Sequence, residues 1–545
     1  MFIKPTMMAS AAALLLALGP TFAVAESSHV AAGDVLAPAD QQTFVSRELD
    51  EFPSIDPNLI QDVSGNDVAR QLFEGLMNQD DKGNLVPGVA TGFDVSADKM
   101  TYTFHLRDDA KWSDGSPVTA KDFVYSWQRA ADPATASEYA WYMSLMGIAN
   151  VDDVIDGKQP PSALAVAAPD DHTFVVTLSQ PLPYFPQMVV NAVTFPVPQK
   201  AIEQYGADWT KPGNMISNGA YMLTERVPQE KLVMERNPNY WDNANTVINK
   251  VTYLIINDEN QALTRYLAGE LDKTEIPTGQ YPRLKEEYPT QAQSFPLLCT
   301  YYYNFNLSDS GPEALKDVRV REALSLAVNR DVIVNNILQG GQKPAYTFTH
   351  WATAGFEAPD LPIMDMTQDE RNAKAQELMK EAGYGTGGKP LSLEILYNTS
   401  DAHKALAVAI GQMWKQTLGI DTSLKNEEWK TFLDDRGKQN YEIARGGWCG
   451  DYNEPSTFLD LMTSTSGYND AKYENPKVDA LMKDARLADN PEADYTQVEQ
   501  IIAQDVPVFP VYAYASVKML NDKIHNWPVD NVQQNYYVKD IYKVQ

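Results

Sequence analysis

Two cysteines, Cys299 and Cys449, limit how this chain can fold, because they are the only cysteines it contains. If the protein is exported to an oxidising compartment, we expect a disulfide between them. That bond would close a loop of about 150 residues and, by the chain-entropy model, contribute about 4–5 kcal/mol to stability. A catalytic or redox thiol is the alternative. Trp448-Cys449-Gly450 begins like a thioredoxin motif, but Tyr452 stands where the second cysteine would be, so we favour the disulfide.

The N-terminus predicts export. An almost wholly apolar run from Met7 to Leu18 follows a lysine, and Ala23-Val24-Ala25 has the small-x-small pattern that precedes a cleavage point. We therefore predict that residues 1–25 are a secretory leader that is removed after Ala25. A retained anchor is the alternative, but Gly19-Pro20 interrupts the run, which is shorter than the ~20 residues of a membrane span. No later run is apolar enough to cross a bilayer, so we expect an exported protein that does not itself span the membrane.

Length, charge and aromatic content narrow the class of protein. At 545 residues the chain is too long for one core, and a prior of about 150 residues per domain predicts about three domains. The net charge of −29 argues against nucleic acid or anionic lipid as a partner. The 10 tryptophans and 28 tyrosines combine apolar faces with polar groups, which suits a solvated binding cleft, although packing alone is the alternative explanation.

The hydrophobic pattern predicts a mixed α/β fold. Alternating or apolar runs predict strands at residues 42–49, 101–106, 173–178, 252–256, 391–397, 420–424, 508–514 and 536–542. Amphipathic runs predict helices at about 66–76, 318–338, 369–382 and 404–418, and Gly419 is expected to end the last of these. Residues from about 75 to 197 resemble an inserted module, and the alternation of strand and helix after Cys299 predicts an α/β lobe.

The stretch from Ala444 to Pro455 is the strongest candidate for a binding site on local chemistry. A predicted strand at Tyr441–Ala444 leads into Gly446 and Gly447, which would allow another backbone to come close. Asp451 follows, flanked by Trp448 and Tyr452, and a carboxylate in such surroundings is poorly solvated unless a cation joins it. The free amine of an extended ligand would serve. An acidic turn after a strand is the simpler alternative.

The sequence contains no complete catalytic motif of the kinds considered. Gly383 through Lys389 has the spacing of a phosphate-binding loop, but Pro390 replaces the hydroxyl residue that would hold magnesium, and the segment follows a helix where the motif needs a strand. The six histidines are scattered, with no pair at metal-ligand spacing, and no Gly-x-Ser-x-Gly elbow occurs. We therefore expect neither a metal nor another cofactor, and we expect a protein that is not an enzyme.

Seven motifs, in order and correctly spaced, carry a resemblance to a known family. They are Leu72-Phe73-Glu74-Gly75-Leu76, Phe104-His105-Leu106-Arg107, Ala110-Lys111-Trp112-Ser113-Asp114-Gly115, Asp122-Phe123-Val124-Tyr125-Ser126-Trp127, Asn218-Gly219-Ala220-Tyr221, Asp317-Val318-Arg319-Val320-Arg321 and Trp448-Cys449-Gly450-Asp451-Tyr452-Asn453-Glu454-Pro455. Over nearly all of its mature length the chain resembles the periplasmic oligopeptide-binding proteins of bacterial ABC importers, solute-binding family 5.

The resemblance implies an α/β receptor with two lobes, three domains and a hinge that closes over an extended peptide. Domain I would comprise residues 26–74, 198–298 and 515–545, domain II residues 75–197, and domain III residues 299–514. The implied partners are short peptides and an inner-membrane ABC permease complex, and the implied state is a periplasmic monomer. The family's cysteine pair falls on Cys299 and Cys449. Relatives that bind murein peptides or another solute leave those ligands as alternatives, and an exported peptide or cell-wall hydrolase is a further one.

The resemblance also implies roles for individual residues. Asp451 would pair with the α-ammonium of the peptide, and the backbones at Val63, Gly447 and Cys449 would bind it by strand addition. Side-chain pockets would be lined by Tyr139, Trp429 and Trp448. The C-terminal carboxylate would be bound, at different peptide lengths, by Arg436, Arg445 and His403. Leu338 and Ala513 stand where well-known members carry a lysine and a tyrosine, so the preferred length and side chains of the peptide stay open.

Overall fold

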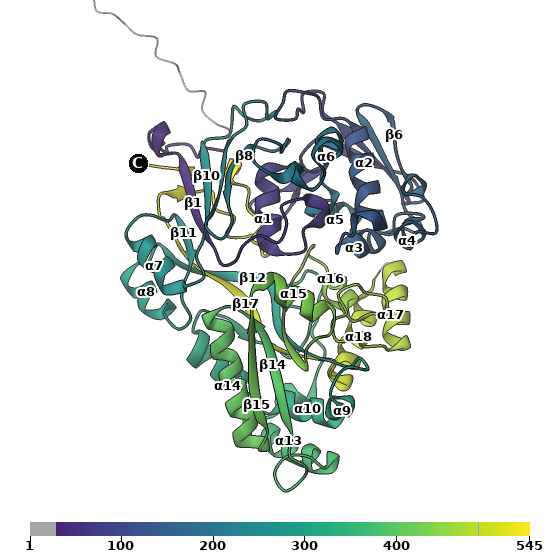
Figure 1. Cartoon of the computed structure of the whole chain (residues 1–545), viewed down its shortest axis with the longest axis vertical. Helices are drawn as coiled ribbons and strands as arrows, with labels where there is room; N and C mark the ends of the chain where they lie inside the picture. Colours follow the sequence, from purple (N-terminus) through teal and green to yellow (C-terminus); the bar gives the residue numbers. More distant parts are fainter. Residues whose placement is uncertain (1–28, 489) are drawn as a thin grey trace, which may run out of the picture.

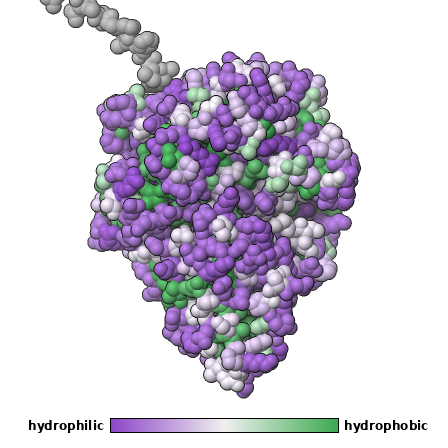
Figure 2. Space-filling model, in the orientation of Figure 1, coloured by the Kyte–Doolittle hydropathy of each residue, from purple (hydrophilic) through white to green (hydrophobic). Residues whose placement is uncertain are grey.

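The computed structural model describes residues 29–488 and 490–545, and the predicted leader lies outside this part. The chain forms two α/β lobes joined by long strands at a waist (Figure 1). Hydrophilic residues cover most of the face drawn in Figure 2. None of the described helices is both long enough and apolar enough to span a membrane.

One sheet of eleven strands runs through both lobes. Its order is β15 (Asp421–Glu427), β14 (Ser392–Asn398), β16 (Ile443–Cys449), β12 (Ala292–Phe305), β17 (Val508–Leu520), β11 (Lys273–Glu275), β1 (Thr43–Glu48), β10 (Lys250–Ile255), β9 (Lys231–Arg236) and β8 (Tyr221–Val227), with β13 (Lys343–Pro344) also paired to β17. The sequence pattern located most of these strands, and the mixed α/β class is confirmed.

Two of these strands, β12 and β17, connect the lobes (Figure 1). At one end β17 pairs with β11, and at the other end β12 pairs with β16. Between these ends β12 and β17 pair antiparallel, with a register shift between Pro296 and Thr300. Proline has no N–H to donate, so the ladder is interrupted at this point. A second register shift lies between Tyr301 and Tyr302. The connection between the lobes is therefore a two-stranded ribbon with two irregularities.

A separate sheet of four strands lies in the upper lobe. Its order is β4 (Ala90–Val95), β5 (Thr101–Leu106), β7 (Thr173–Thr177) and β6 (Val166–Asp170). Helix α2 (Ala120–Ala131) packs on it, and Thr119 and Asp122 form the capping box at its start. Trp127 of α2 is fully buried and donates its Nε1–H to the carbonyl oxygen of Thr194 at 2.8 Å. This bond ties α2 to the segment that ends the inserted module.

The lower lobe is built on long helices against the large sheet. They are α10 (Val318–Leu326), α13 (Gln368–Ala382) and α14 (Asp401–Leu418). Gly419 ends α14 with φ of 73°, as its position in the sequence predicts. Leu324, Leu406 and Trp414 from these helices belong to one buried cluster, and the Nε1–H of Trp414 donates to the carbonyl oxygen of Leu324 at 2.8 Å.

Several predicted elements are wrong in extent. The strands expected over 441–444 and 508–514 run further, as β16 (Ile443–Cys449) and β17 (Val508–Leu520). The helix expected over 318–338 is interrupted after Leu326. The Asn329 side chain accepts from the N–H of Val332 and caps α11 (Arg330–Val332), which continues as a π-helix over Ile333–Leu338, the predicted end. The first helix, α1 (Val63–Leu72), begins after the cap Asp62 and ends before the predicted Leu76, since Phe73 is extended. The strand expected over 536–542 is reduced to β19 (Tyr542–Lys543), which follows a 3-10 turn.

The remaining elements complete the chain. They are β2 (Met77–Gln79), β3 (Leu85–Pro87), α3 (Ala140–Leu145), α4 (Val151–Ile155), α5 (Phe185–Met188), α6 (Gln199–Tyr205), α7 (Glu259–Leu267), α8 (Tyr281–Glu287), α9 (Glu313–Lys316), α12 (Pro362–Asp365), α15 (Trp429–Gly437), α16 (Ser456–Leu459), α17 (Pro476–Leu487), α18 (Glu492–Asp505) and β18 (Ile524–His525).

Candidate functional site

A cavity of about 290 Å3 lies between the lobes, and all ten residues predicted to bind ligand line it. These are Val63, Tyr139, His403, Trp429, Arg436, Arg445, Gly447, Trp448, Cys449 and Asp451. The upper lobe contributes the loop after β1 and the start of α1, and the lower lobe contributes β16, α15 and their neighbours. The structure thus brings together residues that are nearly 400 positions apart in the sequence.

Strand β16 contributes Arg445, Gly447, Trp448 and Cys449 to the cavity wall. Its residues Arg445, Gly447 and Cys449 alternate along one face and are paired with Tyr303, Tyr301 and Cys299 of β12. The parallel neighbour β14 pairs with β16 only as far as Ala444. On the β14 side, the described structure therefore assigns no partner strand to β16 from Arg445 to Cys449.

The two glycines of β16 leave space for different neighbours. A Cβ at Gly446 would collide with the ring of Tyr302, so glycine is required for the packing of the sheet. A Cβ at Gly447 would lie 2.9 Å from Nη2 of Arg445 and 3.2 Å from the hydroxyl oxygen of Tyr514. Both of these atoms belong to residues that line the cavity. Gly447 therefore keeps space open in the cavity itself.

A disulfide joins Cys299 and Cys449, with the Cα atoms 4.0 Å apart, and the sequence-based prediction is confirmed. The two cysteines face each other at paired positions of β12 and β16. The bond therefore fixes the end of β16 two residues before Asp451.

Asp451 lies just beyond β16 and is held by side chains of the upper lobe. Its carboxylate accepts hydrogen bonds from the Tyr139 hydroxyl at 3.1 Å and from Nδ2 of Asn191 at 2.9 Å. Its own N–H donates to Oγ1 of Thr457 at 2.9 Å. Within the described residues no lysine, arginine or histidine forms an ion pair with it, and burial raises the pKa of Asp451 to about 7. The carboxylate is desolvated and has no ion-pair partner among the described residues, and the charge of Arg70 offsets only part of the effect of burial. In this condition it would bind an ammonium group.

The three residues predicted to bind a carboxylate differ in their surroundings. Arg436 forms a buried ion pair with Asp470, with Nε 2.8 Å from Oδ2. His403 is buried, and both burial and the nearby charge of Arg445 lower its pKa well below the ordinary value, so it stays neutral. Arg445 donates to the hydroxyl of Tyr514 at 3.1 Å and lies over the ring of Tyr301. Of the three, Arg445 is the cation that no carboxylate of the described chain neutralises.

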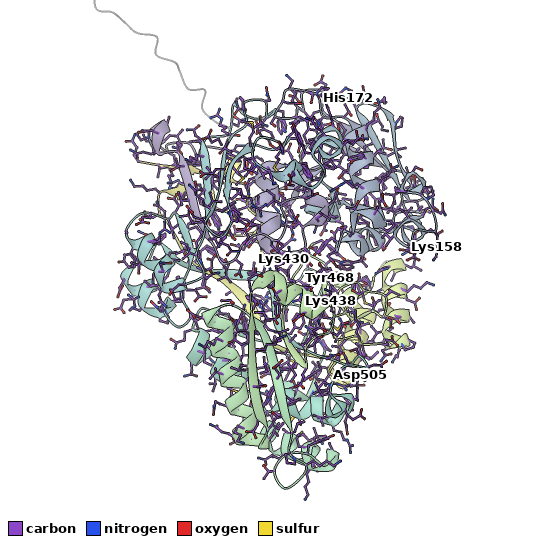
Figure 3. The ribbon with its side chains drawn as sticks, in the orientation of Figure 1. Lys158, His172, Lys430, Lys438, Tyr468 and Asp505 are labelled. Carbon is purple, nitrogen blue, oxygen red and sulfur yellow. A yellow bond between two sulfur atoms is a disulfide. The ribbon has the colours of Figure 1, made fainter. Side chains whose placement is uncertain are left out.

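Several residues of the site were missed from the sequence. Asp62 accepts from the N–H of Gly65 at 3.0 Å, as the cap of α1, and from Nε1 of Trp429 at 2.9 Å, across the lobes. Tyr468, which lies between the lobes in Figure 3, donates to Oε1 of Gln61 at 3.2 Å. The capping role of Asp62 follows a known sequence signal. The positions of Asn191 and Tyr468 have no local signal, because they depend on how the lobes meet.

Aromatic rings from both lobes close the cavity near Asp451. The ring of Trp141 lies 6.1 Å from that of Trp448 and 5.4 Å from that of Tyr468, measured between centroids. Tyr139 packs edge-on against Tyr468 at 5.5 Å. The described residues contain no group of three or more His, Cys, Asp or Glu side chains arranged to hold a metal ion.

Comparison with known proteins places this geometry in a family. The model of the bacterial extracellular solute-binding proteins, family 5, matches residues 84–470. The chain belongs to this family. Within it, the chain is 45% identical over 539 residues to the periplasmic oligopeptide-binding protein OppA of Salmonella typhimurium, covering 97% of this chain and 98% of that protein. It is 46% identical over 523 residues to the periplasmic murein peptide-binding protein MppA of Escherichia coli, covering 95% and 96%.

Two solved structures of MppA, a murein tripeptide-binding protein, allow the arrangement of the lobes to be compared; the first is from Escherichia coli. One aligns with a TM-score of 0.91 at 45% identity, covering 94% of this chain and 100% of the other. The second, described as the unliganded open form, aligns with a TM-score of 0.68 over 94% and 99%. Both structures have 45% identity to this chain and cover 94% of it, so the lower TM-score reflects a difference in conformation. The lobes here are therefore placed differently from those of the open form.

Proposed function

We propose that this family 5 protein is an exported receptor that binds short peptides in an extended form and delivers them to an ABC permease of the inner membrane. The observation that carries the proposal is the edge of β16 from Arg445 to Cys449, which lines the cavity and, among the described residues, has no partner strand on the β14 side. A peptide backbone can add there as a further strand. Such binding uses main-chain groups, so it tolerates many peptide sequences.

Charged residues near the two ends of that edge are complementary to the charged ends of a peptide. Asp451 would pair with the α-ammonium, and Arg445 would bind the terminal carboxylate. The two residues are six positions apart, which at about 3.3 Å per residue gives at most about 20 Å. Asp451 lies in a bend beyond the strand, and the arginine side chain shortens the gap by several ångströms. This span suits a peptide of about three to five residues. Arg436 and His403 are secondary candidates, since one is paired with Asp470 and the other is neutral.

The domain organisation fits a receptor that closes on its ligand. We propose the division into domain I (26–74, 198–298 and 515–545), domain II (75–197) and domain III (299–514). The separate four-stranded sheet lies wholly within domain II, and the two boundaries between domains I and III fall inside β12 and β17. We also propose that the leader is cleaved after Ala25 and that the mature protein is a periplasmic monomer and not an enzyme.

The names of the relatives support peptides as the ligand class. The oligopeptide-binding and murein peptide-binding relatives are 45% and 46% identical to the chain, so similarity alone does not separate the two kinds of peptide. Murein peptides therefore form the second candidate class within the same function.

Calorimetry with purified protein tests the proposal. We expect tri-L-alanine and tetra-L-alanine to bind, and we expect the peptides to be recovered intact by mass spectrometry after long incubation. A murein tripeptide titrated in parallel distinguishes the two ligand classes. Absence of binding by any of these peptides, or their cleavage, would contradict the proposed function. Native mass spectrometry of protein purified without denaturation would show a co-purified ligand as added mass.

A further inference from the structure

Outside the ligand cavity, aromatic side chains of the upper lobe contact the lower lobe at a second place. Tyr184, which directly precedes α5, stacks on Tyr452 with the ring centroids 5.3 Å apart and the ring planes 12° apart. The ring of Tyr142, on α3, lies 6.3 Å from that of the same Tyr452. None of these three tyrosines lines the cavity. The lobes therefore meet at a contact that a ligand in the cavity does not touch.

Tyr452 is held in the lower lobe by its own neighbours. It is 1% exposed, and its hydroxyl is hydrogen-bonded to Oγ of Ser456 at 2.9 Å. Ser456 in turn donates its N–H to Oε2 of Glu454 at 2.7 Å, and the hydroxyl of Tyr495 donates to Oε1 of the same carboxylate at 2.6 Å. All of these bonds lie within the lower lobe, so they position the ring of Tyr452 independently of the upper lobe.

Trp141 makes another contact between the lobes, and Gly467 leaves the space for it. Trp141 lies on α3, and a Cβ at Gly467, in an exposed turn before α17, would be 3.1 Å from atoms of its indole ring. Neither residue lines the cavity, although the neighbouring rings of Trp448 and Tyr468 do. The φ of Gly467 is not positive, so its backbone would accept alanine. The lack of a side chain at this position is therefore what lets the indole approach the lower lobe.

The two contacts belong to one apolar cluster that runs across the lobes. Its buried members include Tyr142 from the upper lobe and Tyr452 and Phe458 from the lower lobe, and Trp141 and Tyr184 pack against it. Figure 1 shows α3 next to α16 where the lobes meet. Opening the lobes would expose these aromatic faces to water, and this cost does not depend on what the cavity holds.

We propose that Tyr184 with Tyr452, and Trp141 with Gly467, form a latch that stabilises the closed arrangement of the lobes independently of the ligand. The inference rests on the proposed function where it takes a peptide as the ligand, but the latch also acts in the empty protein. It offsets part of the cost of desolvating Asp451, so it raises the closed fraction of the empty protein. By the same shift it raises the affinity for every peptide by one common factor.

Two variants disrupt the latch from opposite lobes. Tyr184→Ala removes the stacked ring from the upper lobe, and Gly467→Ala adds a methyl group to the lower lobe that meets the indole only when the lobes are closed. Tyr184 is half-buried and Gly467 is exposed, so the circular dichroism spectra of both variants should match that of the wild type.

Calorimetry measures the effect of the latch on affinity. We expect each variant to raise the Kd of tri-L-alanine and of tetra-L-alanine by about three- to tenfold, the range that one aromatic pair provides. The factor should be the same for both peptides and for their N-acetylated forms, because the latch contacts none of them.

Matched control variants lie away from the contact between the lobes. Tyr205→Ala removes an exposed tyrosine at the end of α6, and Gly92→Ala adds a methyl group on β4 where the neighbouring space is open. Both controls should bind every peptide as tightly as the wild type does.

Small-angle X-ray scattering of the empty protein tests the latch without a ligand. The radius of gyration of Tyr184→Ala and of Gly467→Ala should exceed that of the wild type and of the two controls. Saturating tri-L-alanine should return both variants to the value of the peptide-bound wild type, because the ligand still favours closure.

The outcomes separate this inference from the proposed function. Equal radii of gyration for the empty proteins would overturn the latch, whether or not peptides bind. Unchanged Kd values would also overturn it, and so would a factor that differs between peptides, since the contact would then act through the ligand. If the wild type binds no peptide, the proposed function fails, and the scattering of the empty proteins still decides the latch.

Discussion

Replacing Asp451 with asparagine should remove most of the affinity that the protein has for the free amino terminus of a peptide. Asparagine has nearly the same shape, and its side-chain oxygen can still accept from Tyr139 or Asn191, which now donate to the carboxylate. The variant therefore keeps a neutral contact between the lobes and loses only the negative charge. The change isolates the pairing of Asp451 with an ammonium group.

The structure sets the size of the effect. Removing one partner of a buried charge pair costs about 3–5 kcal/mol, and a half-buried carboxylate belongs at the lower end of that range. We therefore expect a loss of about 3 kcal/mol, or roughly a 150-fold increase in Kd. Acetylating the amino terminus of the peptide removes the other partner, so it should weaken binding to the wild-type protein by a similar factor.

The assay is a cycle of four titrations: tri-L-alanine and its N-acetylated form with wild-type protein and with Asp451→Asn. Acetylation should matter greatly for the wild type and little for the variant, because the pair can be broken only once. Asp434→Asn, outside the cavity, should behave as the wild type. The reasoning is refuted if acetylation weakens binding to both proteins equally, or if the wild type binds both peptides with the same affinity.

Three further predictions concern the same region. Replacing both cysteines with serine opens the loop between Cys299 and Cys449, of 150 residues, and should lower the free energy of unfolding in urea by about 4–5 kcal/mol; reduced wild-type protein should match it, and an unchanged urea midpoint would contradict this. Gly446→Ala should cost about 1–3 kcal/mol of stability through overpacking against Tyr302, whereas Gly447→Ala, whose methyl meets movable side chains in the cavity, should affect peptide affinity more than thermal stability; the reverse order would refute this distinction. Because burial raises the pKa of Asp451 to about 7 and only the ionised form pairs with an ammonium, peptide affinity should fall as pH falls through about 7. In the empty protein, stability depends on pH in the opposite direction. The raised pKa of the Asp451 carboxyl stabilises the fold below about pH 3.8, and this contribution is lost as pH rises through about 7. The melting temperature of the wild type should therefore fall relative to that of Asp451→Asn between these pH values.

Local chemistry identified the right stretch of chain but not its conformation. The sequence predicted a strand ending near Ala444 and, as the simpler alternative to a site, an acidic turn at Asp451, which does lie in a bend. The strand instead continues to Cys449, because the ring of Tyr302 occupies the space that a side chain at position 446 would need, and because β12 pairs with β16 along its full length. Tertiary packing thus reversed a local preference, and the family resemblance, not the local pattern, assigned roles to the residues.

Contacts between the lobes could not be predicted from one sequence. Trp429 lies 367 positions from its acceptor Asp62, and Asp451 lies 260 positions from its donor Asn191. No periodicity or spacing relates such residues. The pairing of Arg436 with Asp470 was missed for a similar reason, and it changes the expected role of Arg436, because an arginine that is already neutralised is a weaker partner for a ligand carboxylate.

Ligand binding and closure share residues, and this explains how one can drive the other. The hydrogen bonds that cross between the lobes at Asp451, Trp429 and Tyr468 all involve residues that line the cavity. Closing the empty cavity desolvates Asp451 without giving it an ion-pair partner among the described residues, which opposes closure. A ligand that supplies an ammonium group removes this cost only in the closed state. A ligand shifts the equilibrium between open and closed states only by the difference in its affinity for the two states. An N-acetylated peptide should therefore leave the lobes further apart than the same peptide with a free amino terminus, a difference that small-angle X-ray scattering can measure.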